Sequence, residues 1–564
     1  MIPRFVAALF LAGAGLAQNV DPRMDQIAQS YVLDKQFMGS VLVARGSQVL
    51  LSKGYGSANL EWQLPDTPST KFRLGSITKQ FTATAILLLE ERGKLKVEDP
   101  VKKYMPDAPA AWDKITIFHV LTHTAGIPNF TSFADYQTSQ ALPTTPEKLV
   151  ARFRDKPLEF EPGEKWNYSN SGYVLLGYLI EKISGESYEK FLQENIFTPL
   201  GMKDTGYDSN SAVIARRASG YAPGPNGPVN AGFVHMSIPF SAGALYSTTE
   251  DLLRWEQGLF GGKVLTAASL EKMTTPFKSD YAFGLVVHTV NGHKVIEHNG
   301  GIQGFNTQLA YYPEDRLTVV ALANLNGGAP EEIATQLAAQ AHGEKVTLPS
   351  ERKEITLASN VLNRYVGAYQ FPIGAAMLIT LEGGQLVSKL GPQAPVPIFP
   401  ESETMFFAKV VSAQIEFPAT STDGKAGQLT LHQNGRDLIG KRLGDDEAKR
   451  MSDAAAAAAK RFKDQTATPG SEAVVREAME KLRTGTPDYD RLSPALADAT
   501  RQQLPQIQAM ITGLGSLRSV AFKGVAPNGA DIYQVKFEGG SLEYRILIGQ
   551  DGKIEGANIR PVSE

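Results

Sequence analysis

The sequence contains no cysteine among its 564 residues. This absence excludes a thiol nucleophile, zinc sites built from thiolates, and disulfide bonds. A chain without covalent cross-links must take its stability from buried apolar cores, and a chain of this length can form several of them. We therefore expect a multidomain protein that is stabilised by packing alone.

An excess of positive charge is also lacking. The formal net charge is −3 and the sequence pI is near 6.3, so a nucleic acid is not expected as a partner. After residue 17, no apolar run reaches the ~18 residues that a membrane-spanning helix needs. We therefore predict no integral membrane segment in the mature chain. A Gly-x-Ser-x-Gly motif is absent too, which argues against an α/β-hydrolase nucleophile elbow.

The first seventeen residues have a composition of their own. Arg4 precedes an apolar run from Phe5 to Leu16, and Gly15-Leu16-Ala17 stands before the polar Gln18. This layout is typical of a secretory signal peptide cut after Ala17, whereas the alternative is a short buried helix. Residues 1–17 are thus predicted to be a signal peptide, and the mature protein is predicted to be secreted or periplasmic.

A candidate nucleophile lies in Gly75-Ser76-Ile77-Thr78-Lys79. Apolar residues at helical spacing follow as far as Glu91, which places Ser76 at or near the start of a helix. A serine and a lysine three residues apart share one helix face, and a lysine buried enough to lose its proton can activate the serine. The Ser-x-x-Lys pattern occurs four times, however, beginning at Ser76, Ser187, Ser269 and Ser350.

Two further triplets select Ser76. Tyr168-Ser169-Asn170 is the only Tyr-x-Asn in the chain, and His298-Asn299-Gly300 is the only His-x-Gly. In this order, the three motifs resemble those of the serine β-lactamase and penicillin-recognising DD-peptidase superfamily. The nearest branch contains class C β-lactamases, D-stereospecific peptidases and related esterases. Residues 71–75 and 121–128 also resemble that branch, and the resemblance covers roughly residues 20–344.

The resemblance implies a role for each motif residue. Ser76 would be the acylated nucleophile, Lys79 its base or proton relay, and Asn170 the residue that holds Lys79 and the substrate amide. Tyr168 would move a proton to the leaving group if the charge of the neighbouring lysine lowers its pKa. The N–H groups of Ser76 and Gly301 would form the oxyanion hole, with Asn299 and Gly300 beside the substrate. We expect Gly300 and Gly301 to let the substrate lie close to the strand.

His298 departs from the family pattern, in which lysine is common at this position. Asn299 is a second departure, since threonine or serine is common there. Neutral imidazole attracts a carboxylate less than ammonium does, so both departures argue against efficient β-lactamase activity. Without its context, His298 would be read as a structural residue at the end of a strand.

His119 and His123 stand four residues apart, a spacing that could place two imidazoles on one zinc ion. Val120 stands where a zinc protease would carry its glutamate, so structural histidines are the preferred interpretation. We accordingly predict that the protein uses no metal and no cofactor.

The pattern along the chain predicts three folded parts after the signal peptide. Residues 18–345 would form an α/β (α+β) catalytic domain, an antiparallel sheet flanked by helices, with a hairpin over 41–51 and strands that include 281–290 and 294–297. Residues 346–354 would be a linker. Residues 355–443 have short strands separated by turn signals, which predicts a barrel or sandwich and resembles the lipocalin-like appendage of such proteins. A helical linker over 444–463 would lead to a small α+β domain at 464–564, to which no chemistry is assigned.

These observations together predict an exported serine hydrolase that forms an acyl-enzyme on esters or amides. Short-chain esters, D-residue peptides and β-lactams are the candidate substrates, with an esterase or D-stereospecific peptidase favoured over an efficient β-lactamase. The competing hypothesis is a penicillin- or peptidoglycan-binding sensor that keeps the fold without turnover. The predicted partners are a small-molecule or peptide substrate, with peptidoglycan as a further candidate.

Overall fold

The computed structural model describes residues 21–562 except 134, 225–226, 349–350, 373–374, 392, 410, 412, 419–423, 434–435 and 550. The predicted signal peptide lies outside the described residues. The chain divides into two compact units. The first contains the chain up to Thr131 together with Gln140–Val346, and the second contains Ser132–Ser139 together with the chain from Thr347 onward.

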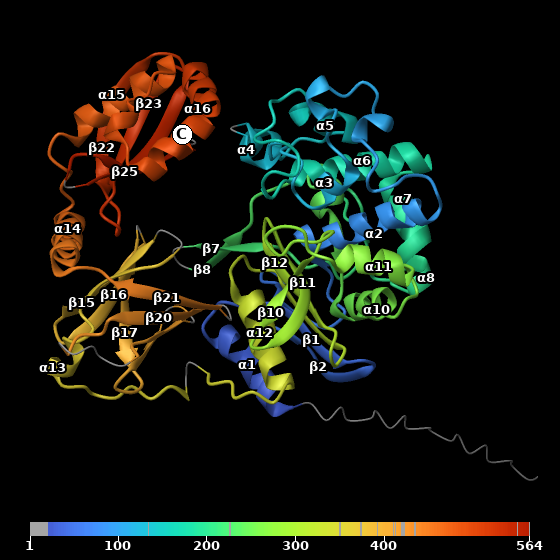
Figure 1. The fold of residues 1–564 in the computed structure, drawn as a ribbon, viewed down its shortest axis with the longest axis horizontal. Helices are drawn as coiled ribbons and strands as arrows, with labels where there is room; N and C mark the ends of the chain where they lie inside the picture. The colour runs from blue at the N-terminus through green and yellow to red at the C-terminus, as the bar shows by residue number, and fades with distance from the viewer. Residues whose placement is uncertain are drawn as a thin grey trace, which may run out of the picture. The chain divides into compact units, whose positions relative to one another are not determined.

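The first unit is built on a six-stranded antiparallel sheet of order β10-β11-β12-β13-β1-β2 (Figure 1). The predicted hairpin is confirmed, because β1 and β2 pair in register from Gly39 with Tyr55 to Arg45 with Gln48. The first and last parts of the domain meet where β1 pairs with β13, Val41 lying opposite Ala321. The strands are β1 (Gly39–Arg45), β2 (Gln48–Tyr55), β10 (Val286–Val290), β11 (His293–Ile302), β12 (Phe305–Tyr312) and β13 (Leu317–Ala323).

Helices pack on this sheet, as predicted for the fold class. The first helix, α1 (Pro22–Leu33), packs against α12 (Ala329–Ala341), and α12 packs on β12 and β13 (Figure 1). Helix α10 (Thr249–Leu259) packs on β1 and β13, and α2 (Thr78–Glu91) is buried from Thr78 to Leu89. Further helices of this unit are α3 (Ile117–Leu121), α5 (Pro146–Arg154), α6 (Asn170–Ser184), α7 (Tyr188–Leu192), α8 (Thr198–Leu200), α9 (Phe240–Gly243) and α11 (Ala267–Thr274).

Short strands and single helical turns complete the first unit. The three small sheets are β3 (Ser57–Asn59) with β4 (Leu64–Pro65), β5 (Phe72–Arg73) and β6 (Gly206–Tyr207) on either side of β9 (Leu245–Ser247), and β7 (Tyr221–Gly224) with β8 (Gly227–Asn230). The turns are η1 (Gly75–Ile77), η2 (Val101–Lys103), η3 (Ala110–Trp112) and η5 (Gln193–Phe197). Near the boundary lie η4 (Phe130–Ser132) and α4 (Tyr136–Ser139).

Two strand predictions need correction. The strand expected over 281–290 begins only at Val286, because Gly284 within that range has a φ of 70°, which an extended strand does not allow. Tyr281 lies before the strand, forms an isolated bridge with Val286, and is buried. The strand expected over 294–297 extends from His293 to Ile302, so His298 lies within β11 and not at its end.

The second unit contains the predicted all-β domain, which is a closed barrel of eight strands. The barrel closes where β14 pairs with β21, Tyr369 lying opposite Arg442. Tyr365, Phe406 and Phe417 are among the aromatic residues of its core. The elements are α13 (Ser359–Leu362), β14 (Gly367–Gln370), β15 (Ala376–Glu382), β16 (Gln385–Leu390), β17 (Val396–Pro400), β18 (Met405–Ala408), β19 (Ala413–Glu416), β20 (Gln428–Gln433) and β21 (Arg436–Arg442).

The last part of the chain is α+β. Helix α14 (Asp445–Asp464) is largely exposed, and α15 (Ser471–Thr484) and α16 (Pro494–Gly513) precede an antiparallel meander. Val475 and Met479 of α15 share a core with the sheet residues Tyr533 and Tyr544. The strands are β22 (Leu517–Val525), β23 (Asp531–Phe537), β24 (Gly540–Ile548) and β25 (Ile554–Val562), after the turn η7 (Tyr489–Arg491). Among the described residues, every helix is too short or too polar to cross a membrane.

Candidate active site

Ser76 lies in the single turn η1, directly before helix α2. The turn depends on Gly75, which has a φ of +55° that side chains disfavour. A β-carbon at Gly75 would also lie 2.8 Å from the backbone nitrogen of Gly301 on β11. This glycine therefore lets η1 approach the strand, which places Ser76 beside the Gly301 amide.

Lys79 is fully buried one turn after Ser76. Its Nζ lies 3.1 Å from Ser76 Oγ, 2.9 Å from Asn170 Oδ1 and 2.8 Å from the carbonyl oxygen of Ala242. All three partners are neutral, and burial holds the pKa of Lys79 well below its usual value of 10.5. The amide and carbonyl oxygens can only accept, so a neutral amine donates to them and turns its lone pair toward Ser76.

Tyr168 and Asn170 approach the same serine from the start of α6. The Tyr168 hydroxyl donates to Ser76 Oγ at 2.8 Å, and Lys79 Nζ lies 4.8 Å from the Tyr168 ring centre. Asn170 is held in turn, since its Nδ2 donates to Thr131 Oγ1 at 3.3 Å and its backbone N–H donates to Asn129 Oδ1 at 3.2 Å. The structure therefore brings Ser76, Lys79, Tyr168 and Asn170 into one hydrogen-bonded group.

The condition that the sequence analysis set for Tyr168 is not met. That condition was a lysine charge that lowers the pKa of the phenol, but burial raises the pKa of Tyr168 well above its usual value. The hydrogen bond with Ser76 opposes that shift only in part. Tyr168 is consequently a proton donor at neutral pH, and Lys79 is the group of the pair suited to accept a proton.

His298 projects from the middle of β11 into the same buried region. Its Nε2 lies 3.1 Å from the Tyr281 hydroxyl, and its Nδ1 lies 2.6 Å from the carbonyl oxygen of Asn299. Burial is the main cause that lowers the pKa of His298 to about 3. The imidazole is therefore neutral at physiological pH, and its ring centre lies 6.3 Å from that of Tyr168.

The glycines of β11 have different surroundings. A β-carbon at Gly300 would lie 1.9 Å from the carbonyl oxygen of Leu74, whereas one at Gly301 would meet only Asn306 Nδ2 at 3.4 Å. Gly300 thus serves the contact between β11 and the segment before Ser76, and not the substrate approach that we expected of it. Asn299 is exposed. The oxyanion role of the Gly301 and Ser76 amides remains a prediction.

The two histidines considered for zinc have separate structural roles. Thr116 caps helix α3, and its backbone N–H lies 3.2 Å from Nδ1 of His119. Nδ1 of His123 accepts the backbone N–H of Ser169 at 3.2 Å. Among the described residues, neither belongs to a cluster of three potential metal ligands. His123 instead packs against the Tyr168 ring, 4.4 Å between centres, and so supports the residues around Ser76.

Several supporting residues escaped the sequence analysis. Tyr281 holds His298, Thr131 and Asn129 hold Asn170, and the Ala242 carbonyl accepts from Lys79. Asn129 and Thr131 directly follow the segment 121–128, which was noted only for its resemblance. The contact through Ala242 involves a backbone atom and leaves no mark in the residue types.

The fold and the site define a known family. The family model for Beta-lactamase matches residues 16–343, more than half of the chain, and the chain therefore belongs to that family. This confirms the resemblance to the β-lactamase and penicillin-binding protein superfamily. A second model, a domain of unknown function (DUF3471), matches residues 351–442, which form the barrel.

Individual relatives agree with this placement. A penicillin-binding protein of Bacillus subtilis (strain 168) is 30% identical over 449 residues, which cover 74% of this chain and 98% of that protein. The octameric penicillin-binding protein homologue from Pyrococcus abyssi has a TM-score of 0.54 at 27% identity, covering 74% of this chain and 99% of its own. A D-stereospecific amidohydrolase from Streptomyces sp. has a TM-score of 0.51 at 26% identity, and the match covers 58% of this chain and 100% of that protein's chain.

Proposed function

We propose that this protein is an exported serine hydrolase that forms an acyl-enzyme at Ser76. The observation that carries the proposal is the environment of Lys79, whose buried amine has two obligate acceptors and directs its third interaction to Ser76 Oγ. A serine is a weak nucleophile until an adjacent base takes its proton, and this lysine can act as that base. Export is supported by the composition of residues 1–17 alone.

The proposed reaction starts with attack of Ser76 Oγ on the substrate carbonyl, while Lys79 Nζ takes the hydroxyl proton. Negative charge then develops on the carbonyl oxygen, which the amides of Ser76 and Gly301 would stabilise. Tyr168, whose hydroxyl lies 2.8 Å from Oγ, is placed to donate a proton to the leaving alcohol or amine. Water then attacks the acyl-enzyme and gives one proton to the Tyr168 phenolate, and the Lys79 ammonium returns a proton to Ser76 Oγ as the acid is released.

Esters and D-residue amides are the favoured substrates. His298 is neutral where a lysine would offer a fixed charge to a substrate carboxylate, so a β-lactam loses an orienting contact there. A substrate with an uncharged acyl group depends less on such an orienting contact, and so it loses less when the contact is missing. The similarity to a D-stereospecific amidohydrolase also favours a D-residue amide or peptide. Peptidoglycan, which contains D-residues, is a candidate natural substrate.

The test combines turnover with covalent labelling. Purified wild-type protein is assayed with a short-chain ester, a D-residue amide and a cephalosporin, and we expect the first two to be hydrolysed with the higher kcat/KM. Ser76→Ala should abolish all turnover, and intact mass after an active-site phosphonate should show one adduct on wild-type protein and none on the variant. Ser187→Ala and Ser269→Ala, which alter the other helical Ser-x-x-Lys motifs, are the controls.

Two results would contradict the proposal. An adduct on the Ser76→Ala variant would place the nucleophile elsewhere. Stoichiometric labelling of Ser76 without turnover of any substrate would favour the penicillin-binding sensor over the hydrolase.

A further inference from the structure

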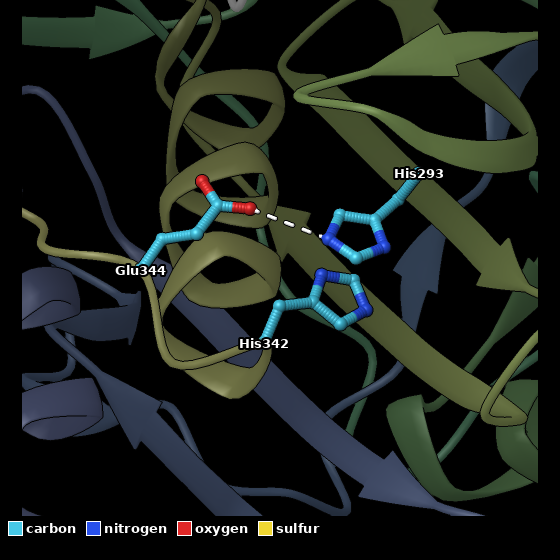
Figure 2. Close-up of side chains that lie close together, drawn as sticks. All are labelled: His293, His342 and Glu344. Carbon is cyan, nitrogen blue, oxygen red and sulfur yellow. Dashed lines mark ion pairs between the residues drawn. The ribbon is translucent and has the colours of Figure 1, made fainter.

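Two histidines and a glutamate converge at the end of the sheet in the first unit. Figure 2 shows His293, the first residue of β11, facing His342, the residue directly after α12, with Glu344 beside them. One potential ligand atom from each residue lies within 4.8 Å of the other two. His293 Nε2 is 3.5 Å from Glu344 Oε1, and the two imidazole ring centres are 3.9 Å apart.

The surroundings of the two imidazoles are acidic. Glu314 Oε2 lies 3.4 Å from His293 Nδ1, and Asp315 Oδ2 lies 3.6 Å from His342 Nε2. With Glu344 the group contains three carboxylates, and Arg45 pairs with one of them, Asp315, at 3.0 Å. The two imidazoles therefore lie in a region with an excess of carboxylate groups, whose negative charge a divalent cation would neutralise.

We propose that His293, His342 and Glu344 bind one divalent transition-metal ion, with Zn²⁺ as the ion that fits best. Two imidazole nitrogens and one carboxylate oxygen are a common zinc ligand set, and a fourth position remains for water or for a neighbouring carboxylate. Calcium and magnesium prefer sites made of oxygen alone, so the two imidazoles select against them. This proposal departs from the prediction that the protein uses no metal.

The three side chains must rearrange locally to bind the ion. Zinc ligands lie about 2.0–2.2 Å from the metal, and hence about 3.3 Å from one another. The His293 and His342 rings are stacked at an interplanar angle of 14°, so one ring must turn before both nitrogens can face the same ion. His293 and Glu344 have side chains that are each 33% exposed, which leaves them room to move, while His342 is 7% exposed and anchors the site.

The position of the cluster indicates a structural role. His293 and His298 lie on the same strand, five residues or ~17 Å apart, and an odd separation puts their side chains on opposite faces of the sheet. The ion would therefore lie away from Ser76 and would tie the end of α12 to the start of β11. We expect metal binding to stabilise the first unit against unfolding and to change ester turnover little.

The test uses full-length, untagged protein that has been stripped with a chelator and titrated with Zn²⁺ alone. Calorimetry should show one bound ion per wild-type chain, and the unfolding temperature should rise with Zn²⁺ concentration. His293→Ala and His342→Ala should each weaken binding at least 10-fold and remove the thermal shift. His432→Ala is the matched control, because His432 also has two carboxylates nearby, Asp437 and Glu416, but no second imidazole.

Circular dichroism and ester turnover establish whether the variants are folded. If a histidine variant fails to fold, Glu344→Gln, which alters a partly exposed side chain, should still weaken Zn²⁺ binding at least 10-fold. Co²⁺ bound to the wild-type protein should give the visible absorption of a site with low coordination number. Wild-type protein that binds no Zn²⁺, or binds it as tightly as the His293→Ala/His342→Ala double variant, would overturn the proposal.

Discussion

Lys79 and Tyr168 both contact Ser76 Oγ, yet burial shifts their proton equilibria in opposite senses. Removing water disfavours the charged form of either group, so the pKa of the lysine falls and the pKa of the phenol rises. The lysine therefore becomes a base and the tyrosine remains an acid. A sequence pattern shows which two groups are adjacent, but the direction of each shift follows only from their burial.

Lys79→Arg should lose activity as fully as Lys79→Ala, although it keeps a positive charge, because a guanidinium does not deprotonate in a protein. We expect kcat for an ester to fall by about 10²-fold or more in both variants. In the wild-type protein, kcat/KM should decrease as the pH is lowered through the depressed pKa of Lys79. An arginine variant with wild-type rates would show that Lys79 acts through its charge and not as a base.

Tyr168→Phe should lower kcat by about 10²-fold, since it removes the proton donor to the leaving group. Tyr173→Phe is the matched control. Its ring also lies near Lys79, 5.5 Å from Nζ, but its hydroxyl donates to the carbonyl oxygen of Leu121 and not to Ser76. In the Tyr168 variant, kcat should fall further for an amide than for an ester, because the amine is the poorer leaving group. Equal losses in the two variants would indicate a packing role for both tyrosines.

At the scale of elements, the site depends on strand β11 and turn η1 lying unusually close to each other. The carbonyl oxygen of Leu74 accepts a hydrogen bond from Thr307 Oγ1 at 2.8 Å, and it occupies the space where a side chain at Gly300 would begin. Gly75 in η1 has the matching effect, because a side chain there would overlap the backbone of Gly301 on β11. The predicted elements can therefore meet at this distance only because both positions lack a side chain.

Gly300→Ala should destabilise the protein by at least about 2 kcal/mol, because the new methyl group would overlap a backbone atom that cannot move independently. Gly301→Ala, whose methyl group meets only the end of the Asn306 side chain, should cost far less. Urea unfolding of both variants and the wild-type protein measures the difference. Equal free energies of unfolding for the two variants would show that β11 shifts freely relative to η1.

At the scale of the whole molecule, buried neutral histidines link stability to pH. The pKa of His298 is about 3 in the folded protein, against ~6.5 for a free imidazole. Below pH ~6.5 the unfolded chain therefore binds a proton that the folded chain does not, so the free energy of unfolding falls as the pH is lowered. His123, whose pKa burial also lowers, acts in the same direction.

His298→Gln should make stability less dependent on pH. Each pH unit between about 6 and 4 costs the wild-type protein up to ~1.4 kcal/mol at this one residue, and the variant should lose that contribution. Urea unfolding at several pH values gives the two slopes. Identical slopes would mean that the His298 imidazole titrates alike in the folded and unfolded chains.

Much of the fold could be predicted because its signals are local. Short strands between turn signals predict the barrel of residues 355–443, and helical spacing after Ser76 predicts α2. The strand expected at 281–290 was wrong in its first half, because Gly284 has a φ of 70° and interrupts the extended backbone. The contact of Tyr281 with His298 was missed because it forms only in the tertiary structure.

The sequence by itself determined the family and the four residues of the hydrogen-bonded group, because Ser76, Lys79, Tyr168 and Asn170 are marked by residue type and spacing. Only the tertiary structure decided how these residues behave, since a pKa depends on burial and on neighbours from other elements. The cluster of His293, His342 and Glu344 also belongs to the tertiary structure. Its two histidines are separated by nearly fifty residues, and the packing of α12 against the sheet is what brings them together.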